Sequence, residues 1–411
     1  MNCGRPRNAG ADGFDERVGH GVGGLNDAVT PTVAVRVDGS PERVAALGSA
    51  LADALDGGPA VLPLGPDAPE PDVAAGPGTA VVIATSGSTG EPKLVGLSAA
   101  AIRASAAATA ARLGGPARWL LALPAEHVAG INVIARALLA GAPPVVQDLH
   151  AGFRPDDFAA ACAELGDGRR YTSLVPTQLL RVLDGNGPAL DALRGFDAVL
   201  VGGAALEAGL RARAVEAGAR IVTTYGMSET CGGCVYDGVP LDGVVVDLDP
   251  DGRVLLGGPT LAGGYLGRPD ETAAAFADGR FRTGDLGRWA DGRLEILGRA
   301  DDVIITGGEK IAPAAVERVL AAQPGVRATC VVGVPDPEWG QAVAAVVVRD
   351  GTDGGWAEPL RAAVRAELGR AAVPRRMLEV AEIPVRGIGK PDRSAVTQLV
   401  TRGGDDLHSS G

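Results

Sequence analysis

Lysine is scarce in this chain of 411 residues. Only three of its 38 basic residues are lysine, namely Lys93, Lys310 and Lys390. A lysine ammonium is a compact point charge on a flexible stem, whereas an arginine guanidinium is a broad planar fork. The two are not interchangeable where one charge must contact two ligand atoms, so these positions are candidates for binding or chemistry. For Lys310, an ordinary hairpin charge is the alternative interpretation.

Net positive charge, a regular cysteine pattern and long apolar runs are lacking too. The formal net charge of −12 argues against a nucleic-acid or anionic-membrane partner. No apolar run reaches the length of a membrane-spanning helix, and the N-terminus lacks the apolar core of a signal peptide. The five cysteines are scattered and odd in number, which suits a reducing compartment better than a disulfide framework. We therefore expect a cytoplasmic protein whose partners are small molecules.

Short apolar stretches alternate with helical patterns over most of the chain. Strands are expected at "PTVAVRVDG", "TAVVIA", "RWLLALP", "PPVVQDL", "YTSLVP", "DAVLVGG" and "RIVTTYG". Helices are expected over 41–56 and 130–140, and between several later strands. This alternation predicts an α/β fold with doubly wound, mostly parallel sheets. Ligands of such sheets bind in loops past the carboxyl ends of strands, where the loops at 85–93, 202–205 and 225–230 are expected.

The pattern changes near residue 298. A hairpin is expected over 301–313, followed by a helix, a strand pair and a second helix over 356–369. We therefore predict a large domain over 29–298 and a small, mobile α+β domain over 299–400. Residues 1–28 are glycine-rich without periodicity and are expected to be a loose leader, and residues 401–411 a disordered tail.

The stretch "TSGSTGEPK", residues 85–93, has the composition of a phosphate-binding loop. Gly87 and Gly90 allow backbone N–H groups to face an anion, and Lys93 adds a positive charge. Further donors are the hydroxyls of Thr85, Ser86, Ser88 and Thr89. The spacing differs from the Walker loop, and a solvated Ser/Gly turn is the alternative interpretation.

This stretch resembles the phosphate loop of the adenylate-forming superfamily, which includes acyl-CoA synthetases, peptide-synthetase adenylation domains and luciferases. Four further stretches resemble motifs of that family in the family's order: "YGMSET" (225–230), "RTGDLG" (282–287), "GRADDVIITGGEKIAPAAVE" (298–317) and "RGIGKPDR" (386–393). The resemblance covers residues 80–393. It implies an enzyme that joins a carboxylate to the α-phosphate of ATP, with release of pyrophosphate.

The resemblance also implies roles at the nucleotide. Glu229 is expected to hold Mg²⁺ beside the ATP phosphates, and Ser228 to offer its hydroxyl to the α-phosphate. Tyr225 is expected to place its ring against adenine, beside a loop that contains Gly203 and Ala204. These expectations place ATP and its metal at the carboxyl ends of neighbouring strands.

The ribose and the domain boundary are expected to share residues. The resemblance implies that Asp285 accepts hydrogen bonds from the ribose hydroxyls and that Arg299 reaches the nucleotide. Asp301 matches the family's pivot, about which the small domain rotates between an adenylating and a thioester-forming pose. A turn-forming carboxylate is the plainer interpretation of Asp301, and both can hold. The loop 306–310 is a candidate for contacts with coenzyme A.

Lys390 matches the catalytic lysine of the family's terminal motif. Carboxylate and α-phosphate repel each other, and a positive charge at their meeting point stabilises both the ground-state pair and the transition state. An ammonium can contact both oxygens at once, whereas a guanidinium fork is a poor substitute. We therefore expect Lys390 to carry the adenylation step.

An acyl pocket is expected around "EHVAG" and "YGMSETCGG". His127 would offer a hydrogen-bonding group to an acid that carries a second polar group, although a capping or surface histidine is the alternative interpretation. The other residues assigned to the pocket are Gly226, Met227, Gly232 and Gly233. Cys231 and Cys234 form a CxxC pair, but no second cysteine or histidine pair stands at zinc spacing, so a metal or redox role is disfavoured.

The stretch "YGMSETCGGCVYDG" resembles short o-succinylbenzoate–CoA ligases of menaquinone biosynthesis, particularly actinobacterial ones. About 85 residues precede the phosphate loop, fewer than in most relatives, so a shortened N-terminal region is expected. We expect ATP, Mg²⁺ and coenzyme A to be required. The alternatives are a ligase for another aryl or short carboxylate, an enzyme that loads a carrier-protein thiol, and a nucleotide-binding regulator without turnover. Oligomeric state, a homodimer included, stays open.

Overall fold

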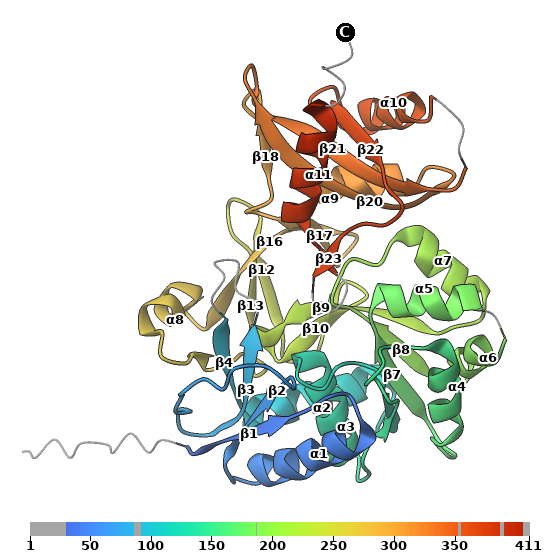
Figure 1. The fold of residues 1–411 in the computed structure, drawn as a ribbon. Helices are drawn as coiled ribbons and strands as arrows, with labels where there is room; N and C mark the ends of the chain where they lie inside the picture. The colour runs from blue at the N-terminus through green and yellow to red at the C-terminus, as the bar shows by residue number, and fades with distance from the viewer. Residues whose placement is uncertain (1–29, 86–91, 186, 352–354, 387–389, 406–411) are drawn as a thin grey trace, which may run out of the picture.

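The computed structural model describes residues 30–85, 92–185, 187–351, 355–386 and 390–405. Figure 1 shows a large lobe, built by the chain up to strand β17, with a small lobe above it that runs from strand β18 to helix α11. The predicted leader over 1–28 lies outside the described residues. None of the described helices is long and apolar enough to cross a membrane.

The first sheet of the large lobe has five strands, and two neighbouring strands of it flank the predicted phosphate loop. Its order is β1 (Thr32–Arg36), β2 (Ala60–Leu64), β3 (Thr79–Thr85), β4 (Lys93–Ser98) and β14 (Gly264–Tyr265). The first three strands are parallel, whereas β3–β4 and β4–β14 are antiparallel. The register pairs Thr85 with Lys93, so the two ends of the predicted loop are neighbours.

The second sheet confirms the predicted parallel architecture. Its order is β11 (Val239–Pro240), β10 (Gly232–Tyr236), β9 (Ile221–Met227), β8 (Ala198–Val201), β7 (Arg170–Leu174), β5 (Arg118–Leu121) and β6 (Val145–Val146). All neighbours from β9 to β6 are parallel. The prediction of a loop over 225–230 was wrong in part, because β9 continues through Tyr225, Gly226 and Met227. The chain then turns in the short 3-10 helix η1 (Ser228–Thr230) and returns antiparallel as β10.

Helices cover both faces of the second sheet, as in a doubly wound fold. One buried cluster joins the first and second sheets through the helices α1 (Pro41–Leu55), α2 (Ala99–Leu113) and α3 (Val128–Leu139). The opposite face packs against α4 (Pro155–Ala163), α5 (Pro176–Gly185), α6 (Pro188–Arg194) and α7 (Ala208–Glu216). All seven strands and both helices that the sequence predicted in this lobe are present.

A third, antiparallel sheet was not predicted. It is formed by β12 (Val245–Leu248), β13 (Arg253–Gly257), β15 (Phe276–Ala277), β16 (Arg280–Ala290) and β17 (Arg293–Arg299). The helix α8 (Pro269–Ala275) precedes β15. The register of β16 and β17 places Asp285 opposite Arg299, so this sheet positions two of the predicted nucleotide residues.

The small lobe has the predicted hairpin, strand pair and two helices. Its sheet contains β18 (Ile304–Thr306), β19 (Glu309–Ile311), β20 (Val326–Asp336), β21 (Gly340–Arg349) and β22 (Arg376–Glu379). α9 (Pro313–Ala321) and α10 (Ala357–Leu368) cover one face, and α11 (Arg393–Asp405) covers the other. The predicted tail was wrong at its start, because α11, which packs on the sheet through Val396 and Val400, continues to Asp405.

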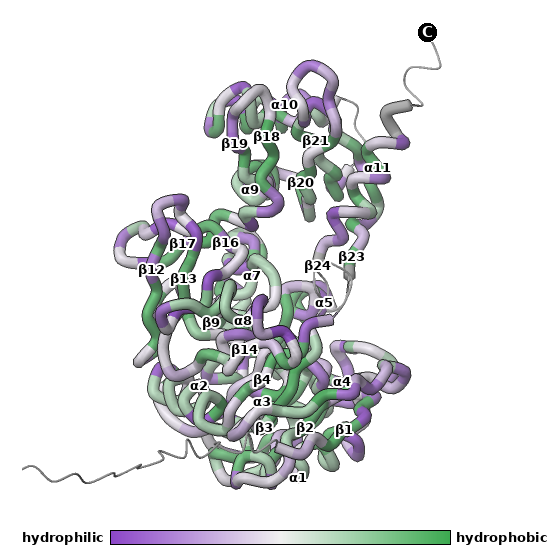
Figure 2. Tube along the Cα trace, turned by 90° about the vertical axis from the view of Figure 1, so that its left-hand side faces the viewer, coloured by the Kyte–Doolittle hydropathy of each residue, from purple (hydrophilic) through white to green (hydrophobic). Residues whose placement is uncertain are grey.

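A two-stranded hairpin precedes α11. Its strands are β23 (Val385–Arg386) and β24 (Lys390–Pro391), and the register pairs Arg386 with Lys390. Figures 1 and 2 both show this hairpin on the side of the small lobe that faces the large lobe. The backbone of Lys390 therefore lies between the lobes, while the placement of its side chain lies outside what the structure describes.

Candidate nucleotide and acyl site

Three predicted nucleotide residues meet where β9, β16 and β17 come together. Tyr225 Oη donates a hydrogen bond of 2.8 Å to Asp285 Oδ2, and Arg299 Nη1 lies 3.7 Å from Asp285 Oδ1. The Asp285 backbone N–H is satisfied by Thr283 Oγ1 at 3.0 Å. Burial, and then the charge of Asp285, raises the pKa of the Tyr225 hydroxyl, so this phenol stays a donor. The contacts with Tyr225 and Arg299 hold the Asp285 carboxylate in place.

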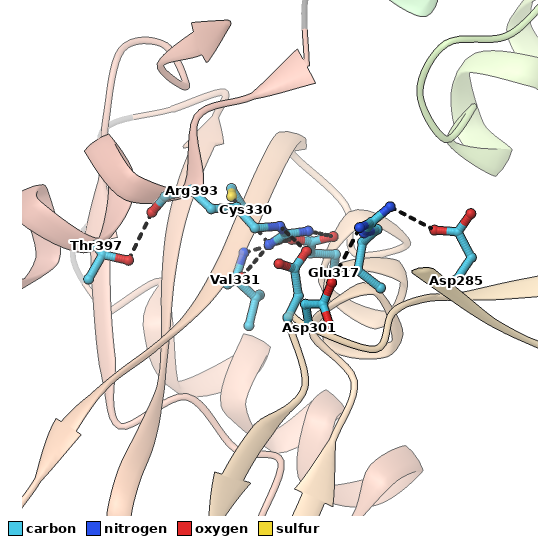
Figure 3. Close-up of polar contacts among 9 residues, drawn as sticks. Asp285, Asp301, Glu317, Cys330, Val331, Arg393 and Thr397 are labelled. Atoms are coloured by element: carbon cyan, nitrogen blue, oxygen red, sulfur yellow. Dashed lines mark hydrogen bonds and ion pairs between the residues drawn. The ribbon is translucent and has the colours of Figure 1, made fainter. Parts of the chain in front are cut away.

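Arg299 also reaches the predicted pivot. Its Nη2 lies 3.4 Å from Asp301 Oδ2, so one guanidinium contacts both Asp285 and Asp301 (Figure 3). Asp301 itself stands in the turn between β17 and β18. The predicted ribose acceptor and the predicted hinge are thus connected by a single side chain.

The loop after β8 lies beside the strand that carries Tyr225. A Cβ at Gly202 would be 2.2 Å from Thr224 Oγ1, so the backbone of this loop packs directly against β9. Gly203 has φ of +81°, a conformation that favours glycine, and it is exposed, whereas Ala204 is partly exposed. The loop therefore lies next to the strand of Tyr225 with two residues accessible, and its role in binding adenine stays a prediction.

Of the predicted phosphate loop, the structure describes the first residue, Thr85, and the last two, Pro92 and Lys93. Thr85 Oγ1 donates to the Lys93 carbonyl at 3.2 Å, which closes the base of the loop. Ser86, Gly87, Ser88, Thr89 and Gly90 lie outside the described residues. Lys93 Nζ pairs with Glu271 Oε2 at 2.7 Å, and Arg268 pairs with the other oxygen of the same carboxylate at 2.9 Å. The hydrogen bond from Lys93 is the larger cause, and the one from Arg268 the next, that holds the pKa of the Glu271 carboxyl below its usual value.

Tyr265 joins the two predicted phosphate residues and was missed by the sequence analysis. Its Oη donates to Glu229 Oε1 at 2.9 Å, and Lys93 Nζ lies 4.6 Å from the centre of its ring. A cation at that distance from an aromatic face is attracted to it. The stretch "GGYLGRPDET" gave no signal beyond one aromatic residue among turn residues, because antiparallel pairing of β14 with β4 is what brings Tyr265 to the loop.

Glu229 is suited to a magnesium ion. Its Oε1 is taken by Tyr265, and among the described residues Oε2 has no hydrogen-bond partner. Magnesium is usually bound through one or two carboxylates together with phosphate oxygens and waters, so a single positioned carboxylate fits. The described residues contain no cluster of three ligating side chains. Ser228, the predicted α-phosphate donor, is the neighbouring residue of η1 and is partly exposed.

The predicted acyl residues gather at the start of α3. His127 is the N-cap residue of this helix, but its side chain makes no capping bond, which leaves the half-buried imidazole available. A Cβ at Gly232 would be 2.4 Å from Asn132 Nδ2 and 3.9 Å from Val128 Cγ2. The first turn of α3 therefore lies against Gly232. Met227, at the end of β9, is partly buried.

The glycines of this region have a packing reason. Gly226 and Gly232 lie so close in the β9–β10 hairpin that a Cβ on Gly226 would be 2.0 Å from the Gly232 carbonyl oxygen. A Cβ on Gly233 would be 3.1 Å from Thr224 Cβ. Close packing of protein atoms explains these residues, and the expectation that Gly232 and Gly233 leave room for a ring stays a prediction.

The CxxC pair is buried and protonated. Burial raises the pKa of Cys231 to about 12 and that of Cys234 to about 11. The thiolate is the form that attacks disulfides and binds metals, so neither thiol is activated for that chemistry. Cys231 instead supports the hairpin, because its carbonyl accepts from Asn132 Nδ2 at 2.8 Å and from Ser105 Oγ at 3.3 Å.

Two family matches and several relatives agree with this geometry. Residues 23–266 match the AMP-binding enzymes, and residues 315–390 match the AMP-binding enzyme C-terminal domain. A probable 2-succinylbenzoate–CoA ligase of Mycobacterium tuberculosis (strain ATCC 25618 / H37Rv) is 47% identical over 324 residues, which are 78% of this chain and 84% of the relative.

Solved structures of similar proteins cover both lobes. The amide bond synthetase McbA from Marinactinospora thermotolerans has a TM-score of 0.72 and 30% identity, covering 90% of this chain and 80% of its own. Wild-type MenE of E. coli, with a bound m-phenylether-linked analogue of OSB-AMS, has a TM-score of 0.71 and 28% identity, covering 92% and 89%. The fold is that of a two-domain enzyme with a large N-terminal and a small C-terminal domain. The chain belongs to the AMP-binding enzyme family, which confirms the resemblance that its five sequence stretches indicated.

Proposed function

We propose that this chain activates o-succinylbenzoate with ATP and transfers the acyl group to coenzyme A. In the first step a carboxylate oxygen attacks the α-phosphorus, and pyrophosphate leaves with the electron pair of the broken P–O bond. In the second step the thiol of coenzyme A attacks the acyl carbon, and AMP and a proton are released. The 47% identity to a probable 2-succinylbenzoate–CoA ligase over most of both chains carries this choice of substrate.

The first step must overcome repulsion between two anions. Two unit charges 4 Å apart repel by about 4 kcal/mol at an effective dielectric constant of 20, which corresponds to about a thousandfold in rate. An ammonium between them reverses the sign of this energy. The position of the β23–β24 hairpin between the lobes supports Lys390 for this role.

We assign the remaining roles in ATP binding to the residues that cluster at the carboxyl ends of the strands. Asp285, oriented by Tyr225 and Arg299, accepts the ribose hydroxyls. Lys93 faces the ring of Tyr265 and Glu229 accepts from its hydroxyl, so phosphate oxygens and a magnesium ion would be held together there. When bound, magnesium supplies positive charge that offsets the phosphate charge.

The second carboxylate of o-succinylbenzoate suits the start of α3. The first N–H groups of a helix have no intrahelical partner and favour an anion, and His127 stands at this end without a capping role. An aryl acid without a second carboxylate would leave these donors unpaired. A relative named feruloyl-CoA synthase, from Streptomyces sp., is 32% identical over 82% of this chain, so a ligase for another aryl acid is the second candidate.

Thioester formation with three acids separates the candidates. Purified protein with ATP, Mg²⁺ and coenzyme A should turn over o-succinylbenzoate with kcat/KM on the order of 100-fold or more above benzoate and succinate, because a site built for a polar group rejects analogues that lack it. Comparable turnover of benzoate would support the other aryl-acid ligase. Adenylate formation from o-succinylbenzoate without any coenzyme A thioester would contradict the proposed transfer.

A further inference from the structure

Arg393 stands three residues after Lys390 and is the first residue of α11. Its side chain lies between α9, β20 and the segment that follows the hinge, as Figure 3 shows. Nη1 and Nη2 contact Glu317 Oε1 at 2.8 Å and Oε2 at 3.3 Å, and Nε lies 3.1 Å from Asp302 Oδ2. The two terminal nitrogens of the guanidinium therefore bind the Glu317 carboxylate, and its Nε binds the Asp302 carboxylate.

The contacts of Arg393 continue into the sheet of the small lobe. Its Nη1 donates to the Val331 carbonyl, and the Val331 N–H donates to Glu317 Oε1 at 2.8 Å. The side chains of Arg393, Glu317 and Asp302 are 30%, 21% and 32% exposed, so solvent screens these pairs less than a surface pair. Burial alone would lower the pKa of Arg393, but Glu317 and Asp302 outweigh it, so the guanidinium stays charged.

Backbone contacts fix Arg393 to the hairpin that carries Lys390. The Asp392 N–H donates to the Pro384 carbonyl at 2.7 Å, which closes the base of the β23–β24 hairpin. Asp392 Oδ1 accepts from the Ala395 N–H at 3.1 Å, which caps the start of α11. A displacement of Arg393 therefore displaces the hairpin as well.

On its other side Arg393 reaches the hinge. Asp302 directly follows Asp301, whose carboxylate contacts Arg299, and Arg299 contacts Asp285 in the large lobe. Figure 3 shows Asp285 at one end of these residues and Arg393 at the other, and the backbone from Asp301 to Asp302 joins the two sets of contacts. The segment after the pivot and the Lys390 hairpin are far apart in sequence, and the guanidinium of Arg393 is a direct connection between them.

We propose that Arg393 is a positioning residue for adenylation, which holds the Lys390 hairpin to the segment just after the hinge so that rotation about Asp301 is transmitted to Lys390. This inference rests on the proposed two-step function. A misplacement of a reacting group by about 1 Å can cost about 100-fold in rate. Loss of Arg393 should therefore slow the step that needs Lys390 and spare the step that does not.

The test measures the two half-reactions of Arg393→Gln separately. Pyrophosphate exchange reports adenylation, and thioester formation from supplied acyl-adenylate reports transfer. We expect kcat for exchange to fall on the order of 100-fold, with the KM for ATP and the transfer rate within about twofold of the parent. In the double variant with Lys390→Ala, Arg393→Gln should cause no further loss, because it acts through Lys390.

Two further variants distinguish a positioning role of Arg393 from a general contribution to the stability of the fold. Asp302→Asn keeps the Arg393–Glu317 pair and removes only the hinge-side partner, so it should show the same split with a loss of about tenfold. Arg349→Gln is the matched control, because the Arg349 side chain is buried in the small lobe and pairs with Glu379 at 2.9 Å between the neighbouring strands β21 and β22. It should change the two half-reactions equally or not at all.

Hydrogen exchange gives a readout that does not depend on activity. Amide protection over residues 390–396 should fall in Arg393→Gln and stay at the parental level in Arg349→Gln. Equal losses in both half-reactions for Asp302→Asn, or unchanged adenylation in both Arg393→Gln and Asp302→Asn, would overturn the inference. A parent protein that exchanges pyrophosphate with none of the acids would instead contradict the proposed function.

Discussion

At the scale of single residues, the site depends on side chains that orient other side chains. Tyr265 illustrates this, because it bonds the predicted magnesium carboxylate with its hydroxyl and faces the loop lysine with its ring. Lys93 is at the same time paired with Glu271. A phosphate that binds Lys93 must therefore compete with a carboxylate, while Tyr265 and Glu229 stay in place.

Replacing Tyr265 by phenylalanine tests this orientation. Tyr265→Phe keeps the ring beside Lys93 and removes the hydrogen bond to Glu229, which is worth about 1.5–3 kcal/mol for a charged acceptor. We expect the Mg²⁺ concentration for half-maximal pyrophosphate exchange to rise roughly tenfold. Tyr171→Phe is the control, because Tyr171 is a buried tyrosine of the second sheet that donates to the Leu113 carbonyl. An equal Mg²⁺ requirement in both variants would refute the role of Tyr265.

The candidate nucleotide residues could be predicted in two ways. A phosphate needs glycines, hydroxyls and a cation, so the stretch that ends in Lys93 stands out by its composition, whereas Asp285 was predicted only because "RTGDLG" resembles a family motif. Tyr265 and Arg393 could not be predicted in this way. Their partners are far away in the chain, and only the pairing of β14 with β4 and the packing of α11 bring them together.

At the scale of elements, the β9–β10 hairpin packs against α3 in the predicted acyl region. Gly232 has φ of +80°, and a Cβ there would be 2.4 Å from Asn132 Nδ2. Asn132 also bonds the Cys231 carbonyl, so α3 and the hairpin are locked together. A side chain at Gly232 would force these two elements apart.

Gly232→Ala should therefore destabilise the large lobe by about 1–3 kcal/mol, the usual cost of a strained backbone conformation with its local clash. Urea unfolding measures the loss. Gly209→Ala is the matched control, because a Cβ there meets no atom within 4 Å and the residue lies in α7. The control should stabilise by about 0.5–1 kcal/mol. A Gly232→Ala protein as stable as the control would show that the hairpin can adapt.

The parallel sheet and the small lobe could be predicted from the sequence, whereas the third sheet could not. Strands such as β8, buried along their whole length, are short continuous apolar runs and stand out. The strands of the third sheet contain many charges, and three of the four buried positions of β16 hold Thr283, Asp285 and Gly287 instead of large apolar residues, so the hydrophobic period is weak. The end of α11 was missed because its last residues, 401–405, include two glycines and no apolar residue, and therefore continue no helical apolar pattern.

At the scale of the whole molecule, a carboxyl group of the large lobe is affected by a like charge of the small lobe. Glu207 is the N-cap residue of α7 in the large lobe, and the pKa of its carboxyl is raised by burial and then by the charge of Glu317 in the small lobe. The folded protein therefore binds this proton more tightly than the unfolded chain does. The ionised group opposes folding at neutral pH, and that opposition fades as the pH falls through the raised pKa toward the ordinary value of 4.5.

Glu207→Gln should consequently raise the apparent Tm at pH 7.5, by about 1–2 °C, and give no gain at pH 4. Differential scanning calorimetry at both pH values measures the difference. Glu216→Gln, on the exposed end of the same helix, should have no such pH-dependent effect. A gain of the same size at both pH values would contradict the electrostatic explanation.

The lobes are also expected to move about Asp301. A proline there fixes φ and removes the freedom that a pivot needs. Asp301→Pro should keep adenylation within a few-fold of the parent and lose thioester formation, if the adenylating pose is the one retained. Single-turnover assays of each half-reaction measure this. Equal impairment of both would indicate loss of stability instead of a blocked rotation.

The central claim is that Lys390 draws the carboxylate and the α-phosphate together, and its most direct test is Lys390→Ala in the two half-reactions. We predict that pyrophosphate exchange falls about 1000-fold while ATP affinity changes only a few-fold, because repulsion between the two anions is no longer offset. Thioester formation from supplied o-succinylbenzoyl-adenylate should continue at the parental rate. An equal fall in both half-reactions, or adenylation that survives without the ammonium, would contradict this claim.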